Sequence, residues 1–173
     1  MRTLPAAAGV AVPLLLLAPA AHAHLVSVRF GDYYSGLLHP ITALEHALAF
    51  VALALFAGMQ GPRTARWMLL LFSLALLVGT AGAILAGFEG SLEVVNTTSF
   101  VMIGALVAFG APLALEVAVI LAVMFGLSHG VANGTAFLAG GNPWLYVAGV
   151  TTAGYVVVAI LSAAVVAARH LAW

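Results

Sequence analysis

Three residues able to bind a metal ion, His39, Glu45 and His46, lie close together in the first half of the chain. Long apolar runs surround them, and a charged residue at the centre of a membrane helix costs about 2.5–3.5 kcal/mol on insertion scales. Such residues usually face the interior of a helix bundle and mark a site or an ion pathway. In a continuous helix, His39 and His46 share one face and Glu45 points to the side. Pro40 lacks a backbone donor and loosens the turn around His39.

A second polar segment, Ser-His-Gly-Val-Ala-Asn-Gly, begins at Ser128. His129 and Asn133 are one helical turn apart and share a face. Contact between the two helices would gather His39, His46, His129 and Asn133 around one outward-opening pocket, with Glu45 at its flank. Imidazole, amide and carboxylate groups suit Ni²⁺, Co²⁺, Zn²⁺ or Cu²⁺, and these ligands do not choose among them. The alternative is that each histidine only hydrogen-bonds a neighbouring helix.

The N-terminal segment has the features of a secretory signal peptide. Arg2 precedes an apolar stretch from Ala6 to Ala18, and Ala21-His22-Ala23 supplies the small residues of a cleavage site. We expect residues 1–23 to be a signal peptide and residues 24–173 to be a single transmembrane domain. The alternative is an uncleaved first helix. Cleavage would leave His24 with a free α-amine, which can chelate a metal together with its imidazole. A solvated terminus without metal is the other interpretation.

The composition is that of a polytopic membrane protein. Of the 173 residues, 65% are hydrophobic and only 6% are charged, and the mean hydropathy is +1.21. A soluble domain carries roughly 25% charged residues. The formal net charge is zero, so a nucleic-acid partner has no support, and the lack of cysteine excludes thiolate metal sites and cysteine nucleophiles. We therefore expect an all-α transmembrane bundle in a lipid bilayer.

About five spans follow the signal peptide, and glycine and proline residues separate them. The expected spans are Tyr34–Gly58, Arg66–Gly87, Leu92–Gly110, Pro112–Leu138 and Trp144–His170. The fourth is long, and its glycines at positions 126, 130 and 134 permit a break near His129. Its Glu116 lies at the cytoplasmic end, as an exit acid or as a solvated residue. Glu89 and Glu93 are expected near the external mouth of the pocket.

The arginines predict the orientation in the membrane. Arg63 and Arg66 lie in one loop and Arg169 lies near the C-terminal end. The positive-inside rule places these residues in the cytoplasm. We therefore expect a protein of the bacterial inner membrane, with the mature N-terminus outside and the C-terminus inside. Five spans make a thin pore, which favours a homo-oligomer or a partner complex in the membrane.

The two polar segments resemble motifs of the HupE/UreJ family of membrane proteins. The family's first helix carries His-Pro-x-x-Gly-x-Asp-His, which corresponds to residues 39–46, and a later helix carries His-Gly-x-Ala-His-Gly, which corresponds to residues 129–134. The resemblance implies a small, signal-bearing protein linked to hydrogenase or urease maturation, and a nickel permease or uptake accessory. Here Ala43 replaces the glycine, Glu45 the aspartate and Asn133 the second histidine. Compared with the family motifs, the chain thus keeps a carboxylate at position 45 and has an oxygen ligand in place of one imidazole at position 133.

Three classes of function follow. The first is inward passage of a divalent transition metal, with nickel as the expected ion, through the His/Glu/Asn-lined site. The second is a non-transporting accessory or structural subunit of a larger membrane complex. The third is an enzyme or a haem protein, which we do not expect: Ser128 and His129 lack the Gly-x-Ser-x-Gly setting, and adjacent helical residues point about 100° apart.

Overall fold

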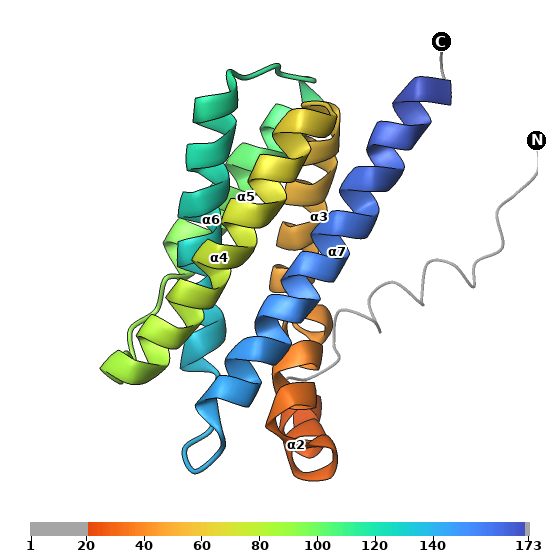
Figure 1. Ribbon diagram of the computed structural model, residues 1–173. Helices are drawn as coiled ribbons and strands as arrows, with labels where there is room; N and C mark the ends of the chain where they lie inside the picture. The colour runs from red at the N-terminus through yellow and green to blue at the C-terminus, as the bar shows by residue number, and fades with distance from the viewer. Residues whose placement is uncertain (1–20, 172–173) are drawn as a thin grey trace, which may run out of the picture.

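Six helices make up the part of the chain that the structure describes. The structure is a computed structural model, which describes the backbone of residues 21–171 and the side chains of residues 31–169. In chain order the helices are α2 (Ala21–Thr42), α3 (Leu44–Met59), α4 (Pro62–Ala86), α5 (Glu93–Ala108), α6 (Leu115–Thr135) and α7 (Pro143–Leu171) (Figure 1). The expected all-α class is confirmed. Residues 1–20, most of the expected signal peptide, lie outside the described residues.

Three of these helices, α4, α6 and α7, are long and apolar enough to cross a membrane. The second part of α2, Gly31–Thr42, and α3 pass the same test together as a pair bent by 74°. The helix α5 has 16 residues, about 24 Å at 1.5 Å per residue, whereas the hydrocarbon core is about 30 Å thick. These apolar helices fit a membrane protein, with three or four spans supported, and the count of five stays a prediction.

The first expected span, Tyr34–Gly58, is not one continuous helix. Ala43 has an extended backbone (φ −80°, ψ 106°) between the end of α2 and the start of α3. Pro40 has no N–H to donate, and the Thr42 hydroxyl donates to the carbonyl oxygen of Leu38 at 2.9 Å, which satisfies a group near the helix end. The chain therefore turns sharply at Ala43, inside the first polar segment.

The helix α6 runs unbroken from Leu115 to Thr135, so the break that its glycines permit is absent. Gly126, Gly130 and Gly134 instead lie against α4. A Cβ atom at Gly130 would stand 2.6 Å from the carbonyl oxygen of Leu76, and one at Gly126 would stand 2.6 Å from that of Phe72. Small residues let membrane helices approach backbone to backbone. The glycine spacing therefore reports the packing of α4 on α6.

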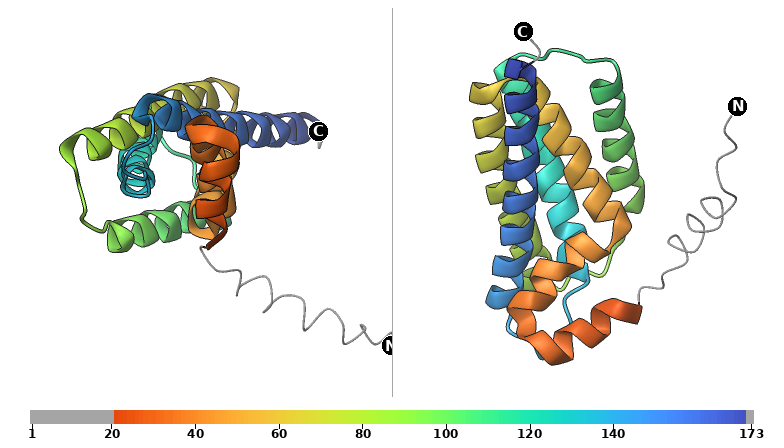
Figure 2. Two further views of the ribbon diagram at one scale, coloured as in Figure 1. Left: turned by 90° about the horizontal axis from the view of Figure 1, so that it is seen from below. Right: turned by 90° about the vertical axis from the view of Figure 1, so that its right-hand side faces the viewer.

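The helix α5 lies at the edge of the bundle, on the side away from α4 and α7 (Figure 2). It contacts α3 and α6, and Ile103 is its one buried residue. The helix α7 packs against α2, α3 and α4 on the opposite side. The boundary between α3 and α6 is therefore covered on one side by a lightly packed helix.

Candidate functional site

Three imidazole rings stand in a row where α2, α3 and α6 meet. The centroids of the His39 and His46 rings are 5.6 Å apart, and those of the His46 and His129 rings are 5.9 Å apart. His46 is 6% exposed and His129 only 2%, while His39 is half-buried. Histidines from the two separate polar segments thus lie close together.

The reason for the approach of His39 to His46 differs from the one expected. The two residues do not share a face of one helix, because the 74° bend at Ala43 lies between them. His39 is in the last turn of α2 and His46 is in the first turn of α3. The bend itself brings the two rings together, on either side of the broken span.

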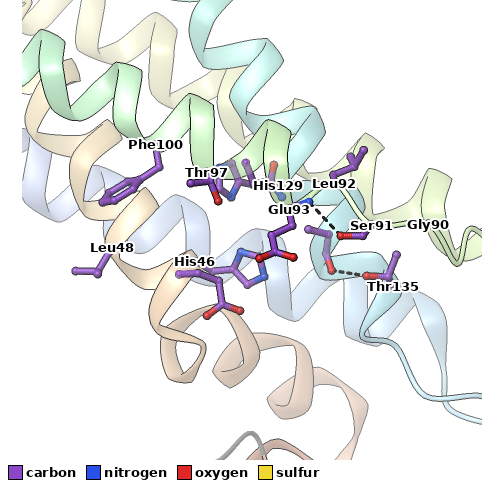
Figure 3. A pocket seen from close by; sticks show the side chains of 13 residues that line it. His46, Leu48, Gly90, Ser91, Leu92, Glu93, Thr97, Phe100, His129 and Thr135 are labelled. Atoms are coloured by element: carbon purple, nitrogen blue, oxygen red, sulfur yellow. Dashed lines mark hydrogen bonds between the residues drawn. The ribbon is translucent and has the colours of Figure 1, made fainter. Parts of the chain in front are cut away.

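A cavity of about 590 Å³ adjoins this row between α3, α5 and α6. Among the expected site residues, Glu45, His46 and His129 line it, and Glu93 of α5 lines it as well. Glu93 reaches from α5 toward His46 (Figure 3). The segment from Gly90 to Leu92 forms one wall, at the end of the bundle where α5 begins. The cavity therefore combines two imidazoles and two carboxylates from three helices.

Asn133 lies behind the cavity rather than on its wall, and none of its surface is exposed. Its side-chain Nδ2 donates to the carbonyl oxygen of His129 at 2.7 Å. The backbone carbonyl oxygen of Asn133 accepts a hydrogen bond of 2.9 Å from the Tyr146 hydroxyl. The centroid of the Tyr146 ring is 6.4 Å from that of the His39 ring. Asn133 and Tyr146 thus tie α6 to α7 beside the histidine row.

Several buried polar atoms at this place have no hydrogen-bond partner. They include Nδ1 of His46, Nδ1 of His129 and Oδ1 of Asn133. Buried polar atoms are paired in the large majority of cases, and an exception calls for a bound water, an ion or a functional role. Each of these atoms can present a lone pair to a water or to a cation.

The described residues do not form a closed metal cage. Within this part of the chain, no group of three or more His, Cys, Asp or Glu residues is placed to hold an ion together. Glu45 is exposed, and the side chain of His24 lies outside the described residues. Glu89 is not part of the cavity wall. Glu116 is exposed at the start of α6, about 20 Å along the helix from His129.

Two contacts of His129 were not expected from the sequence. The Phe125 ring stacks on the His129 ring with centroids 4.1 Å apart, and Ser99 Oγ lies 3.3 Å from its Nε2. The polar run of residues 96–99 in an apolar helix marks a polar face and was a usable signal for Ser99. Phe125 and Tyr146 carry no such signal, because aromatic residues are ordinary in membrane helices.

Similarity to a known protein family extends over almost the whole chain. The family model described as HupE / UreJ protein matches residues 12–173, which include both polar segments and all six helices. Protein HupE of Rhizobium leguminosarum bv. viciae is 34% identical over 139 residues, which are 78% of this chain and 70% of that relative. No solved structure gives a significant match.

Proposed function

Because this chain belongs to the HupE/UreJ family, we propose that it passes a divalent transition metal, nickel, inward through the membrane. The family is associated with uptake of nickel or cobalt for hydrogenase and urease. One observation carries the proposal: three imidazoles from α2, α3 and α6 stand in a row beside a cavity of about 590 Å³. In this proposal the ion is the cargo, and His39, His46 and His129 are its successive ligands.

The polar neighbours have distinct roles in this proposal. The carboxylates of Glu45 and Glu93 attract the cation to the cavity, and the unpaired Oδ1 of Asn133 adds an oxygen ligand behind His129. His24 is a first contact at the mature N-terminus. An ion pathway needs ligands that hold the ion weakly enough to release it. An open set of imidazoles and oxygens meets that need better than a closed cage.

The positions of the arginines support a cavity that opens to the outside of the cell. Arg63 and Arg66 lie in the first turns of α4, and Arg169 lies in the last turn of α7, where its guanidinium donates to the Met59 carbonyl oxygen. The cavity wall at Gly90–Leu92 follows the other end of α4. By the positive-inside rule the arginine end is cytoplasmic and the cavity opens outward, so the proposal has the ion enter at Glu45 and Glu93.

The test is uptake of radioactive nickel by cells or vesicles that contain the protein. We expect His46→Ala and His129→Ala to lower uptake about tenfold or more, because each removes a ligand from the row. His170→Ala, the same substitution near the C-terminal end of the chain, is the matched control and should take up nickel as the wild type does. Equal uptake by wild type and His46→Ala, at equal protein levels, would refute the proposal.

A non-transporting membrane accessory is the second candidate. The observation that favours it is that no group of three or more His, Cys, Asp or Glu among the described residues is placed to hold a metal ion. In that case the histidines only hold helices together, and a partner complex carries the function. Purification from native membranes with a stoichiometric partner, combined with unchanged nickel uptake after deletion of the gene, would support this candidate over a permease.

A further inference from the structure

The peripheral helix α5 reaches the histidine row through the side chain of Ser99. Ser99 Oγ lies 3.3 Å from Nε2 of His129, across the boundary between α5 and α6. The rest of α5 is lightly packed, with only Ile103 fully buried. This contact therefore joins a loosely held helix to one of the most buried side chains of the site.

The Ser99 hydroxyl has a single hydrogen, which determines the direction of this contact. Ser99 Oγ donates that hydrogen to the carbonyl oxygen of Asn96 at 2.9 Å, three residues back on the same helix. We assign the hydrogen to this shorter contact, so that toward His129 the hydroxyl accepts. With this assignment the hydrogen of the Ser99–His129 contact comes from Nε2 of the ring.

The other ring nitrogen is left with a lone pair. In a neutral imidazole, a hydrogen on Nε2 means that Nδ1 is an acceptor. Nδ1 of His129 is buried and has no hydrogen-bond partner. The Phe125 ring stacks on the His129 ring and the His46 ring meets it edge-on, so neighbouring rings hold the imidazole in place. The geometry thus presents one defined nitrogen without a partner.

We propose that Ser99 is a positioning residue that holds His129 in its Nε2–H tautomer and so makes Nδ1 the nitrogen that takes the metal. This inference rests on the proposed function for the identity of the ligand, although the tautomer itself does not depend on it. A metal-binding histidine generally donates its other N–H to an oxygen partner, and loss of such a partner typically weakens metal binding 10–100-fold. The oxygen partner here comes from α5, so the position of this helix sets the affinity of a ligand on α6.

Two variants of α5 separate positioning from packing. Ser99→Ala removes the acceptor, whereas Ser99→Thr keeps a hydroxyl that can make the same backbone bond. Thr98→Ala is the matched control, because it removes a hydroxyl from the adjacent, exposed position of the same helix. A purely structural role for Ser99 would leave the His129 tautomer unchanged in all three variants.

The first measurement is the ¹⁵N NMR spectrum of histidine-labelled, metal-free protein, with His129→Ala for assignment. We expect the Nε2–H pattern for His129 in wild type, Ser99→Thr and Thr98→Ala, and its loss or mixing in Ser99→Ala. A wild-type ring with the hydrogen on Nδ1, or a Ser99→Ala ring that keeps the wild-type pattern, overturns the inference.

The second measurement is nickel affinity of the purified full chain by titration calorimetry. We expect Ser99→Ala to bind Ni²⁺ about 10–100-fold more weakly than wild type, with Ser99→Thr and Thr98→Ala within about threefold. Equal affinity of wild type and Ser99→Ala overturns the metal part of the inference. An intact tautomer pattern in a wild type that binds no nickel refutes the proposed function instead, so the two failures are distinguishable.

Discussion

The substitution Gly130→Ala tests the close approach of α4 and α6, on which the position of His129 depends. The added Cβ would stand 2.6 Å from the carbonyl oxygen of Leu76 and 3.0 Å from the backbone nitrogen of Thr80. Both are backbone atoms, so no side chain can rotate away to make room. Ordinary contact begins at 3.4 Å, and the two helices must therefore separate locally by about 0.8 Å.

The expected loss of stability follows from two opposing effects. Overpacking of a tight interface costs about 1–3 kcal/mol, whereas alanine is favoured over glycine inside a helix by up to about 1 kcal/mol. We therefore expect Gly130→Ala to lower the free energy of unfolding by about 1–2 kcal/mol. The matched control is Gly104→Ala in α5, where the added Cβ meets nothing within 4 Å. That variant should be neutral or slightly more stable than the wild type.

The assay is unfolding of the purified proteins in detergent micelles, followed by circular dichroism, with all variants under one set of conditions. A Gly130→Ala protein that is as stable as Gly104→Ala would show that the two backbones do not touch as the structure has them. Gly126→Ala should behave like Gly130→Ala, because its Cβ would also lie 2.6 Å from a backbone oxygen of α4. A loss of stability in only one of these two variants would contradict a continuous contact between α4 and α6.

Two further predictions concern polar contacts outside the site. Gln60 connects the end of α3 to the loop between α5 and α6 through two hydrogen bonds of 2.9 Å each. Gln60→Leu should therefore lower the free energy of unfolding by about 1–3 kcal/mol. An unchanged unfolding midpoint would contradict this prediction. The Asp32 carboxylate accepts a hydrogen bond of 2.7 Å from the backbone N–H of Asn142, just before α7. Asp32→Ala should speed hydrogen exchange of that backbone N–H about tenfold, as measured by mass spectrometry or NMR. An exchange rate equal to that of the wild type would show that the contact does not protect this group.

The two polar segments could be found in the sequence because they interrupt apolar runs. In a membrane protein each ionisable residue at depth needs a reason, so His39, His46 and His129 stood out and do lie together. Their grouping was predicted for a partly wrong reason, since a helix period relates His39 to His46 only if the helix is continuous. Residue types alone did not reveal the extended backbone of Ala43, which separates the two helices.

The glycines of α6 show how one pattern fits two structures. A glycine spaced every four residues allows either a break in a helix or a close contact with a neighbour. The choice depends on whether another backbone is present, and α4 supplies it at Gly126 and Gly130. The same limit applies to Ser99 and Tyr146, whose partners lie 30 and 13 residues away in the chain.

Composition alone determined that this chain is a bundle of membrane helices, because a chain with 6% charged residues has no polar surface to offer water, and in lipid the backbone must satisfy its own hydrogen bonds. Residue types and spacing also predicted which side chains would bind a cation. Tertiary packing alone decided the bend between α2 and α3, the position of α5 at the edge of the bundle and the pairing of Ser99 with His129. These features depend on contacts between distant segments, and sequence spacing specifies the direction of a side chain around its own helix but not the neighbour that it meets.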